Sequence, residues 1–310
     1  MGSAKQVISL IETESVATSA SRTLNAENLG FYSFQVSGHK REKERTGLSR
    51  KIRFNRFLFD SQSGLVLKPI HQSRGAREKK FYEMVWKKRI SKDYVQELQP
   101  LVPRYYGKAK ILVYDKETTF LQLENLTEGF LHPSMMDIKI GASTWDRNAG
   151  CLKMMFSWCM SRYRPFANLG FRIEGMKVYN KTDDSYTTLD DLNYPTPFLA
   201  TESQVVTALA VFFAVAVRPD WNVCVEKVLK NLRRIELWFQ RHRKLRMMAS
   251  SILVIYESKD DGNPKVCVKM IDFAHVYSSR TKDSNYLYGL GNLIQCMELL
   301  LQEYEYTFAH

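Results

Sequence analysis

PSMMDIKIG, residues 133–141, sets an acid and a base two positions apart in an otherwise apolar stretch. Successive side chains of a strand point to opposite faces of a sheet. Asp137, Lys139 and Gly141 therefore share one face, while the two isoleucines between them point into a core. A carboxylate, an ammonium group and a bare backbone side by side suit a phosphate site. The alternative, which so short a charge pair ordinarily indicates, is an ion pair on the surface of an edge strand.

Three other fragments place charged or hydroxyl side chains where a predicted strand begins or ends. LVLKPI is an apolar strand that ends in Lys68, and Glu78 follows ten residues later at the start of a helical pattern. VKMID ends in Asp272, which the tripeptide FAH follows. ASSILVIYE places Ser250 and Ser251 at the start of another predicted strand, which precedes VKMID in the chain. Each fragment alone is weak evidence of function. The order of all four fragments along the chain is much stronger evidence, because a family of proteins shares it.

Together these fragments resemble the inositol polyphosphate kinase family, whose signature Pro-x-x-x-Asp-x-Lys-x-Gly fits residues 133–141. The resemblance covers residues 65–277 and implies a two-lobed, kinase-like (ATP-grasp-related) α+β fold. An antiparallel sheet would form the nucleotide lobe, and a larger C-terminal lobe would carry a short inositol-binding insert. The domains expected from it are a disordered tail at 1–28, the N-terminal nucleotide lobe at 29–126 and the C-terminal lobe at 127–310, with the insert at 142–170.

The resemblance also implies ATP and Mg²⁺ as cofactors. Lys68 would contact the nucleotide phosphates, Glu78 would orient Lys68, and Asp272 would bind the magnesium ion. Adenine would meet the backbone of Glu124 and Leu126 in the link between the lobes. The complete set of expected nucleotide-binding residues is Lys68, Glu78, Glu124, Leu126, Ser251 and Asp272. Serines that begin a strand are, however, usually structural.

Asp137 and Lys139 are the catalytic residues that the resemblance implies. Asp137 would contact or deprotonate the attacking hydroxyl, or else bind ribose, and Lys139 would hold the transferring or a neighbouring phosphate. A lone histidine is more often structural than functional, and only its place beside Asp272 makes His275 a candidate. The expected contacts with the inositol phosphate are Arg74, Lys139, Lys153 and His275.

The charge of the chain favours anionic partners. The 310 residues carry 45 basic and 33 acidic side chains, a net charge of +12. Nucleic acid, an anionic membrane and a polyphosphate substrate would all suit this excess. The basic run at 40–53 is either a solvated loop, a nuclear-import patch or a flap that faces phosphate. We expect inositol phosphates as partners, with phosphoinositide lipid at a membrane surface as a second class, no specific nucleic acid, and a monomer.

Cysteine usage and hydropathy indicate the compartment. The five cysteines are scattered and lack zinc-site spacing, as buried thiols in a reducing compartment would. The N-terminus has no signal-peptide pattern, and the longest apolar run, 208–217, is shorter than the roughly 20 residues that cross a bilayer. We therefore expect a cytoplasmic and nuclear protein.

Three helices are expected in the C-terminal half. A capping box at Thr201 and Gln204 predicts a helix up to Val217. A near 3.6-residue apolar period with a basic opposite face predicts a second helix over 223–247. A third is expected over 286–304.

Within the family, Ala274-His275 resembles the multikinases and the hexakisphosphate kinases, and the short insert favours the multikinases. The implied activity is ATP-dependent phosphorylation of inositol trisphosphate to tetrakis- and pentakisphosphate, with phosphatidylinositol bisphosphate as a further acceptor. An inositol hexakisphosphate kinase is the alternative inside the family. Outside it, a non-catalytic basic scaffold or nucleic-acid binder would explain the charge but not Lys68, Glu78, Asp137 and Asp272 together. A protein kinase is disfavoured because no His-Arg-Asp loop is present.

Overall fold

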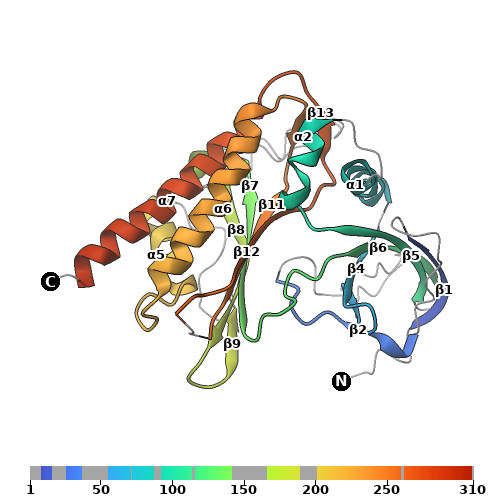
Figure 1. Ribbon diagram of the computed structural model, residues 1–310, viewed down its shortest axis with the longest axis horizontal. Helices are drawn as coiled ribbons and strands as arrows, with labels where there is room; N and C mark the ends of the chain where they lie inside the picture. The colour runs from blue at the N-terminus through green and yellow to red at the C-terminus, as the bar shows by residue number, and fades with distance from the viewer. Residues whose placement is uncertain are drawn as a thin grey trace, which may run out of the picture. The chain divides into compact units, whose positions relative to one another are not determined.

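The fold is that of a computed structural model (Figure 1), which describes residues 8–15, 26–36, 55–70, 72–86, 92–113, 116–141, 166–188, 201–259 and 262–308. The chain divides into two compact units. The N-terminal unit is Met1–Glu128 and the C-terminal unit is Gly129–His310. The division falls two residues after the expected lobe boundary. Mixed helix and antiparallel sheet in both units confirm the expected α+β class.

An antiparallel six-stranded sheet, in the order β1-β5-β6-β4-β3-β2, forms the N-terminal unit together with two helices. Side chains of β5 alternate strictly between buried and half-buried, which is the period of a strand with one face on a core. That core contains Leu67, Ile111 and Phe120. The elements are β1 (Ile8–Ser15), β2 (Leu29–Phe31), β3 (Leu58–Asp60), β4 (Leu65–Pro69), α1 (Gln72–Val85), α2 (Asp93–Gln96), β5 (Tyr105–Val113) and β6 (Lys116–Leu123), with short 3-10 turns at Ala26–Asn28 and Gln99–Leu101.

Strand β1 corrects the expectation of a disordered tail at 1–28. Its residues pair antiparallel with β5, from Ile8 opposite Val113 to Ser15 opposite Gly107. The polar composition of the segment concealed the strand, because an edge strand draws much of its stability from backbone hydrogen bonds to its neighbour. Strand β2, which pairs with β3, ends at Phe31.

The C-terminal unit is built on a five-stranded antiparallel sheet in the order β12-β11-β7-β8-β9. Helices α5, α6 and α7 lie on one side of this sheet (Figure 1). Strand β7, the PSMMDIKIG strand, is central, and every side chain in it except Lys139 is buried. The elements are β7 (Pro133–Ile140), α4 (Phe166–Leu169), β8 (Phe171–Asn180), β9 (Ser185–Thr188), α5 (Glu202–Phe212), α6 (Trp221–Arg241), β10 (Leu245–Met247), β11 (Ser251–Glu257), β12 (Val266–Ile271), β13 (Val276–Ser278) and α7 (Ser284–Phe308).

Two helices of this unit end earlier than their apolar patterns predict. The capping box of Thr201 and Gln204 is present, but α5 ends at Phe212, and Ala214 adopts a left-handed φ of 52° in the turn that follows. Helix α6 ends at Arg241, and Leu245–Met247 leave it to pair with β13 as strand β10. Phe213 and Val215 after α5, and Leu245 and Met247 after α6, are still buried, so periodicity alone could not locate the breaks.

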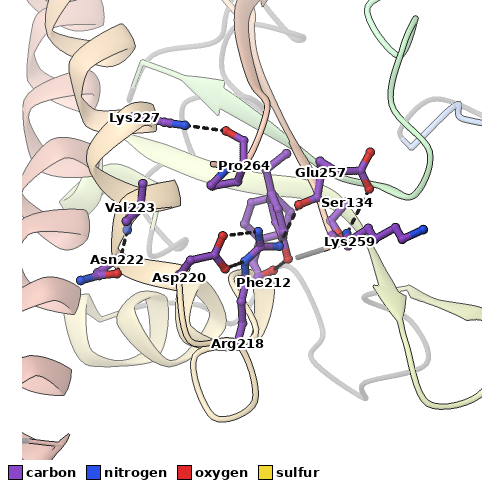
Figure 2. Close-up of polar contacts among 12 residues, drawn as sticks. Ser134, Phe212, Arg218, Asp220, Asn222, Val223, Lys227, Glu257, Lys259 and Pro264 are labelled. Atoms are coloured by element: carbon purple, nitrogen blue, oxygen red, sulfur yellow. Dashed lines mark hydrogen bonds and ion pairs between the residues drawn. The ribbon is translucent and has the colours of Figure 1, made fainter. Parts of the chain in front are cut away.

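A buried arginine ties the loop before α6 to the end of β11 (Figure 2). The Arg218 guanidinium donates to both oxygens of Asp220, at 2.5 and 2.9 Å, and to the carbonyl of Glu257 at 2.8 Å. The Glu257 carboxylate in turn accepts from the backbone N–H groups of Leu131 and His132, which lead into β7. This network therefore anchors the entrance of the central strand.

Candidate functional site

Lys68 and Glu78 form an ion pair within the N-terminal unit. Lys68 lies near the end of β4, opposite Leu121 of β6, and Glu78 lies on α1. The ammonium nitrogen is 2.8 Å from a Glu78 carboxylate oxygen, and their side chains are 16% and 7% exposed. Two charges so far from bulk water hold one another in a single geometry. The pair that the family resemblance implied thus exists, while Arg74 lies exposed in the first turn of α1.

The link after β6 is held by side chains that the sequence did not reveal. Asn125 Oδ1 accepts from the Thr127 N–H at 3.2 Å, the Thr127 hydroxyl at 2.8 Å and the Tyr32 hydroxyl at 3.0 Å. Such an Asx turn is built from local geometry and needs no ligand. The Glu124 carboxylate accepts from the backbone N–H of Arg104 at 2.9 Å. Within the described residues the Leu126 N–H makes no backbone hydrogen bond. An N–H that donates to a nucleotide base must be available in this way.

Lys139 of the C-terminal unit pairs with Glu174, where the sequence suggested Asp137 as its partner. The ammonium nitrogen lies 3.1 Å from Glu174 Oε1. Glu174 can reach it because β8 carries a bulge: Asp137 stands opposite Gly175 and Ile138 opposite Ile173, which leaves Glu174 as the extra residue. Asp137 itself is only 2% exposed. The central position of β7 also excludes the alternative of an edge-strand ion pair.

Arg172 completes a three-charge cluster with Glu174 and Lys139. Arg172 lies directly opposite Lys139, and its guanidinium donates to Glu174 Oε1 through Nε at 2.6 Å and through a terminal nitrogen. Burial raises the pKa of Glu174, but Lys139 and Arg172 outweigh burial, and the net pKa is lowered from its ordinary value of 4.5. Sequence reasoning missed both residues. The alternation of Arg172 and Glu174 with apolar neighbours in FRIEG was the available signal.

Gly141 has a packing role at the end of β7. Its φ of 102° lies in the region that favours glycine, and a Cβ there would fall 2.3 Å from the Asn285 side chain. The Gly141 N–H donates to the Gly170 carbonyl at 2.7 Å, and a Cβ on Gly289 of α7 would fall 1.9 Å from the same oxygen. The three glycines let α7 approach the ends of β7 and β8.

Asp272 follows β12 with a left-handed φ of 65°. Non-glycine residues in this region are strained and gather at functional sites. Ser251 stands opposite both Lys139 of β7 and Ile271 of β12, so the sheet sets Lys139 and the residue before Asp272 on strands two apart. Among the described residues, the buried hydroxyl of Ser251 has no hydrogen-bond partner. Because Ser251 stands opposite the last residue of β12, its oxygen is available to a polar ligand at this end of the sheet.

A divalent cation fits Asp272 only with help from a bound nucleotide. The described parts of the chain contain no group of three or more His, Cys, Asp or Glu that could hold a metal. Mg²⁺ is commonly bound by one or two carboxylates together with substrate phosphates and water. Asp272 supplies one such carboxylate, and nucleotide phosphates with water would complete the coordination.

His275 lies three residues beyond Asp272. Its carbonyl accepts from the Met248 N–H at 3.0 Å, and its Nδ1 is 3.5 Å from the Tyr277 hydroxyl. That separation is longer than a good hydrogen bond. Lys153, residues 142–165 of the insert and the basic run at 40–53 lie outside the described residues. No described helix is both long and apolar enough to span a membrane.

Comparison with known proteins connects these residues to one family. An inositol polyphosphate multikinase from Homo sapiens is 30% identical over 232 residues, which are 73% of this chain and 50% of that protein. Inositol polyphosphate multikinase beta from Arabidopsis thaliana is 28% identical over 273 residues, 80% of this chain and 88% of that protein. The chain thus spans about half the length of the human relative.

A crystal structure of the inositol phosphate multikinase Ipk2 from S. cerevisiae, in complex with ADP and Mn²⁺, shares the fold. Its TM-score is 0.60 at 24% identity, covering 76% of this chain and 99% of that one. The sequence model of inositol polyphosphate kinases matches residues 120–298, more than half of the chain. These residues include Asp137, Lys139, Ser251 and Asp272. The chain belongs to the inositol polyphosphate kinase family.

Proposed function

We propose that the protein is an ATP-dependent inositol polyphosphate multikinase that converts inositol trisphosphate successively to the tetrakis- and pentakisphosphate. The observation that carries the proposal is the register of Lys139, Ser251 and Ile271 across three adjacent strands. Neighbouring strands lie about 4.8 Å apart, so the backbone of Lys139 is about 10 Å from that of Ile271. Lys139 would bind a phosphate of the acceptor, and Asp272, which follows Ile271, would bind the metal ion. This spacing suits phosphoryl transfer between the two.

Phosphoryl transfer depends mainly on positioning and charge neutralisation. Lys68, held by Glu78, neutralises the nucleotide phosphates. Lys139 holds a phosphate of the acceptor, and Asp137 contacts the attacking hydroxyl and takes its proton. The hydroxyl oxygen bonds to the γ-phosphorus while the bond to the bridging oxygen of ADP breaks. Asp272 would hold a magnesium ion, which would supply positive charge to neutralise the nucleotide phosphates.

Two comparisons support this reaction class. The human and Arabidopsis thaliana relatives both carry the name multikinase, and the yeast neighbour was crystallised with ADP and Mn²⁺. ATP with a divalent metal is therefore the cofactor pair that we propose for this chain. Phosphatidylinositol bisphosphate is proposed as a further acceptor, because it presents the same clustered phosphates to Lys139.

Incubation with magnesium-ATP and a panel of inositol phosphates, with products resolved by position, tests the proposal. Inositol trisphosphate should give the tetrakisphosphate first and the pentakisphosphate later. A turnover confined to the hexakisphosphate would identify the alternative kinase, and no product from any acceptor would favour a binding protein.

Two variants separate nucleotide from acceptor. Lys139→Ala should lose acceptor phosphorylation while keeping basal ATP hydrolysis, and Lys68→Ala should impair both. Equal losses in both assays for Lys139→Ala would contradict its assignment to the acceptor.

A further inference from the structure

Six cations gather where α6, the β10–β13 strand pair and the start of α7 meet. We call this set the basic patch; it consists of Arg241, Arg243, Lys244, Arg246, Arg280 and Lys282. The pairing of β10 with β13 brings its two segments together, with Arg246 opposite Tyr277 and the Ser279 N–H donating to the Lys244 carbonyl at 2.9 Å. Figure 1 shows the end of α6 and β13 at the same end of the unit.

The patch is almost uncompensated. Residues 241–248 and 276–283 contain a single carboxylate, that of Asp283. Its side chain is fully buried, where it accepts from the Met247 N–H at 2.7 Å and lies 3.9 Å from Arg246. All the patch residues except Arg246 are exposed. The surface therefore presents several solvent-facing positive charges and no exposed negative one within these two segments.

Local structure accounts for only part of this charge. Arg241 ends α6, where a cation stabilises the partial negative charge of a helix C-terminus. Arg246 is explained by its proximity to Asp283. The remaining four, Arg243, Lys244, Arg280 and Lys282, lie in turns and in the chain between elements, where neither reason applies. Clustered like charges repel one another, so the arrangement favours an anionic partner.

We propose that the basic patch docks the protein on an anionic lipid bilayer. Exposed cations spread over a strand pair and its turns match a flat array of headgroups, whereas a soluble polyphosphate is held in a concave site. Leu237 adds an apolar group: it is 42% exposed and lies one helical turn before Arg241 on the same face of α6. A leucine beside cations is the pairing found in interfacial helices.

Nucleic acid suits the patch less well. Single strands are bound by stacking bases on exposed aromatic rings, and duplexes by helices or arms that enter a groove. Tyr277 is the sole tyrosine, phenylalanine or tryptophan in the two segments, and it is half-buried. Bilayer docking needs neither feature.

Docking would place a membrane next to the proposed acceptor site. The Met248 N–H bonds to the His275 carbonyl, and the Met247 N–H bonds to Asp283, so β10 is fastened to the segment that follows Asp272. If the proposed function holds, the patch presents lipid-borne phosphates to this segment. The docking itself does not depend on kinase activity.

Sedimentation of the full chain with phosphatidylcholine vesicles, containing phosphatidylserine or phosphatidylinositol bisphosphate, tests docking without ATP. Each lysine or arginine near an anionic leaflet strengthens binding about five-fold, so R243Q/K244Q/R280Q should bind about 100-fold more weakly than wild type. The matched control K92Q/K116Q/K181Q removes three exposed cations elsewhere and should stay within about five-fold. Wild-type binding should also fall as salt rises. Thermal melting checks that each variant is folded.

Two further variants distinguish membrane docking from DNA binding and from kinase activity. Leu237→Ser should weaken vesicle binding and leave any binding of duplex DNA unchanged. Asp272→Asn should bind vesicles like wild type even when turnover is lost, so failure of the kinase assignment would leave docking intact. Equal losses in patch and control variants, no wild-type binding to either vesicle, or release by soluble inositol trisphosphate would each overturn the proposal.

Discussion

The Lys139 ammonium lies 3.1 Å from the Glu174 carboxylate, and this ion pair joins the central strand β7 to the bulge in β8. Arg172 donates to the same carboxylate. Glu174 therefore sets where the signature lysine points, although it lies outside the signature itself. An incoming acceptor phosphate would meet two cations that already share one anion.

This cluster should make stability depend on acid pH. The folded-state pKa of Glu174 is lowered, so the folded protein binds the proton less tightly than the unfolded chain does. Its contribution is complete above the ordinary pKa of 4.5 and is lost as pH falls through the lowered folded value. Glutamine at position 174 cannot titrate. Glu174→Gln should therefore flatten the acid part of the curve of melting temperature against pH. Glu226→Gln, at an exposed position on α6, is the control and should leave the profile unchanged.

Asp272→Asn should keep the fold and lower turnover by about 100-fold or more, because the charge that would hold the metal is lost. Asparagine tolerates a left-handed φ at least as well as aspartate, so strain at this position does not increase. Asp184→Asn changes a second aspartate with positive φ, 51°, in the β8–β9 turn and should be active. Near wild-type turnover of Asp272→Asn at saturating magnesium would show that the metal is held elsewhere.

Glu78→Gln should weaken the use of ATP, because Lys68 loses its charged partner at 2.8 Å. A charge-assisted hydrogen bond contributes about 1.5 to 3 kcal/mol, so kcat/KM for ATP should fall about ten-fold or more. The control is Glu83→Gln on the same helix, whose pair with Lys79 is more exposed. If both variants lose activity equally, the effect belongs to α1 as a whole and not to Lys68.

Gly289→Ala should destabilise the C-terminal unit by about 3 kcal/mol, because its methyl group would lie 1.9 Å from the Gly170 carbonyl oxygen. Gly291→Ala, two residues along the same helix, meets nothing within 4 Å and should raise stability by up to about 1 kcal/mol. Denaturant unfolding of both variants measures the difference. Similar effects at the two positions would mean that α7 is not so closely packed on β7 and β8.

Arg218→Ala should cost about 3 to 5 kcal/mol of unfolding free energy, because it leaves the buried Asp220 carboxylate without its cation. Arg233→Ala breaks an exposed pair with Glu298 and should cost no more than about 1 kcal/mol. Chemical denaturation provides both values. A small loss for Arg218→Ala would show that water reaches Asp220 readily.

Local patterns predicted the elements that local forces stabilise. Alternation along residues 133–141 placed Asp137 and Lys139 on one face, and the capping box at Thr201 marked the start of α5. The resemblance to the family implied the pair of Lys68 and Glu78, and the ion pair forms between β4 and the helix that follows it. The resemblance to the family rested on the same short fragments.

Long-range contacts decided the rest. The partner of Lys139 depends on how β8 registers against β7, and a bulge in β8 shifts that register without leaving a periodic signal in sequence. Strand β1 forms because β5 offers it an open edge. The basic patch exists because α6 stops at Arg241 and β10 pairs with a strand about thirty residues away, which is decided by packing rather than by propensity. Sequence by itself determined which side chains line each strand, and tertiary structure decided which of them meet, since cross-strand partners are set by register between distant segments.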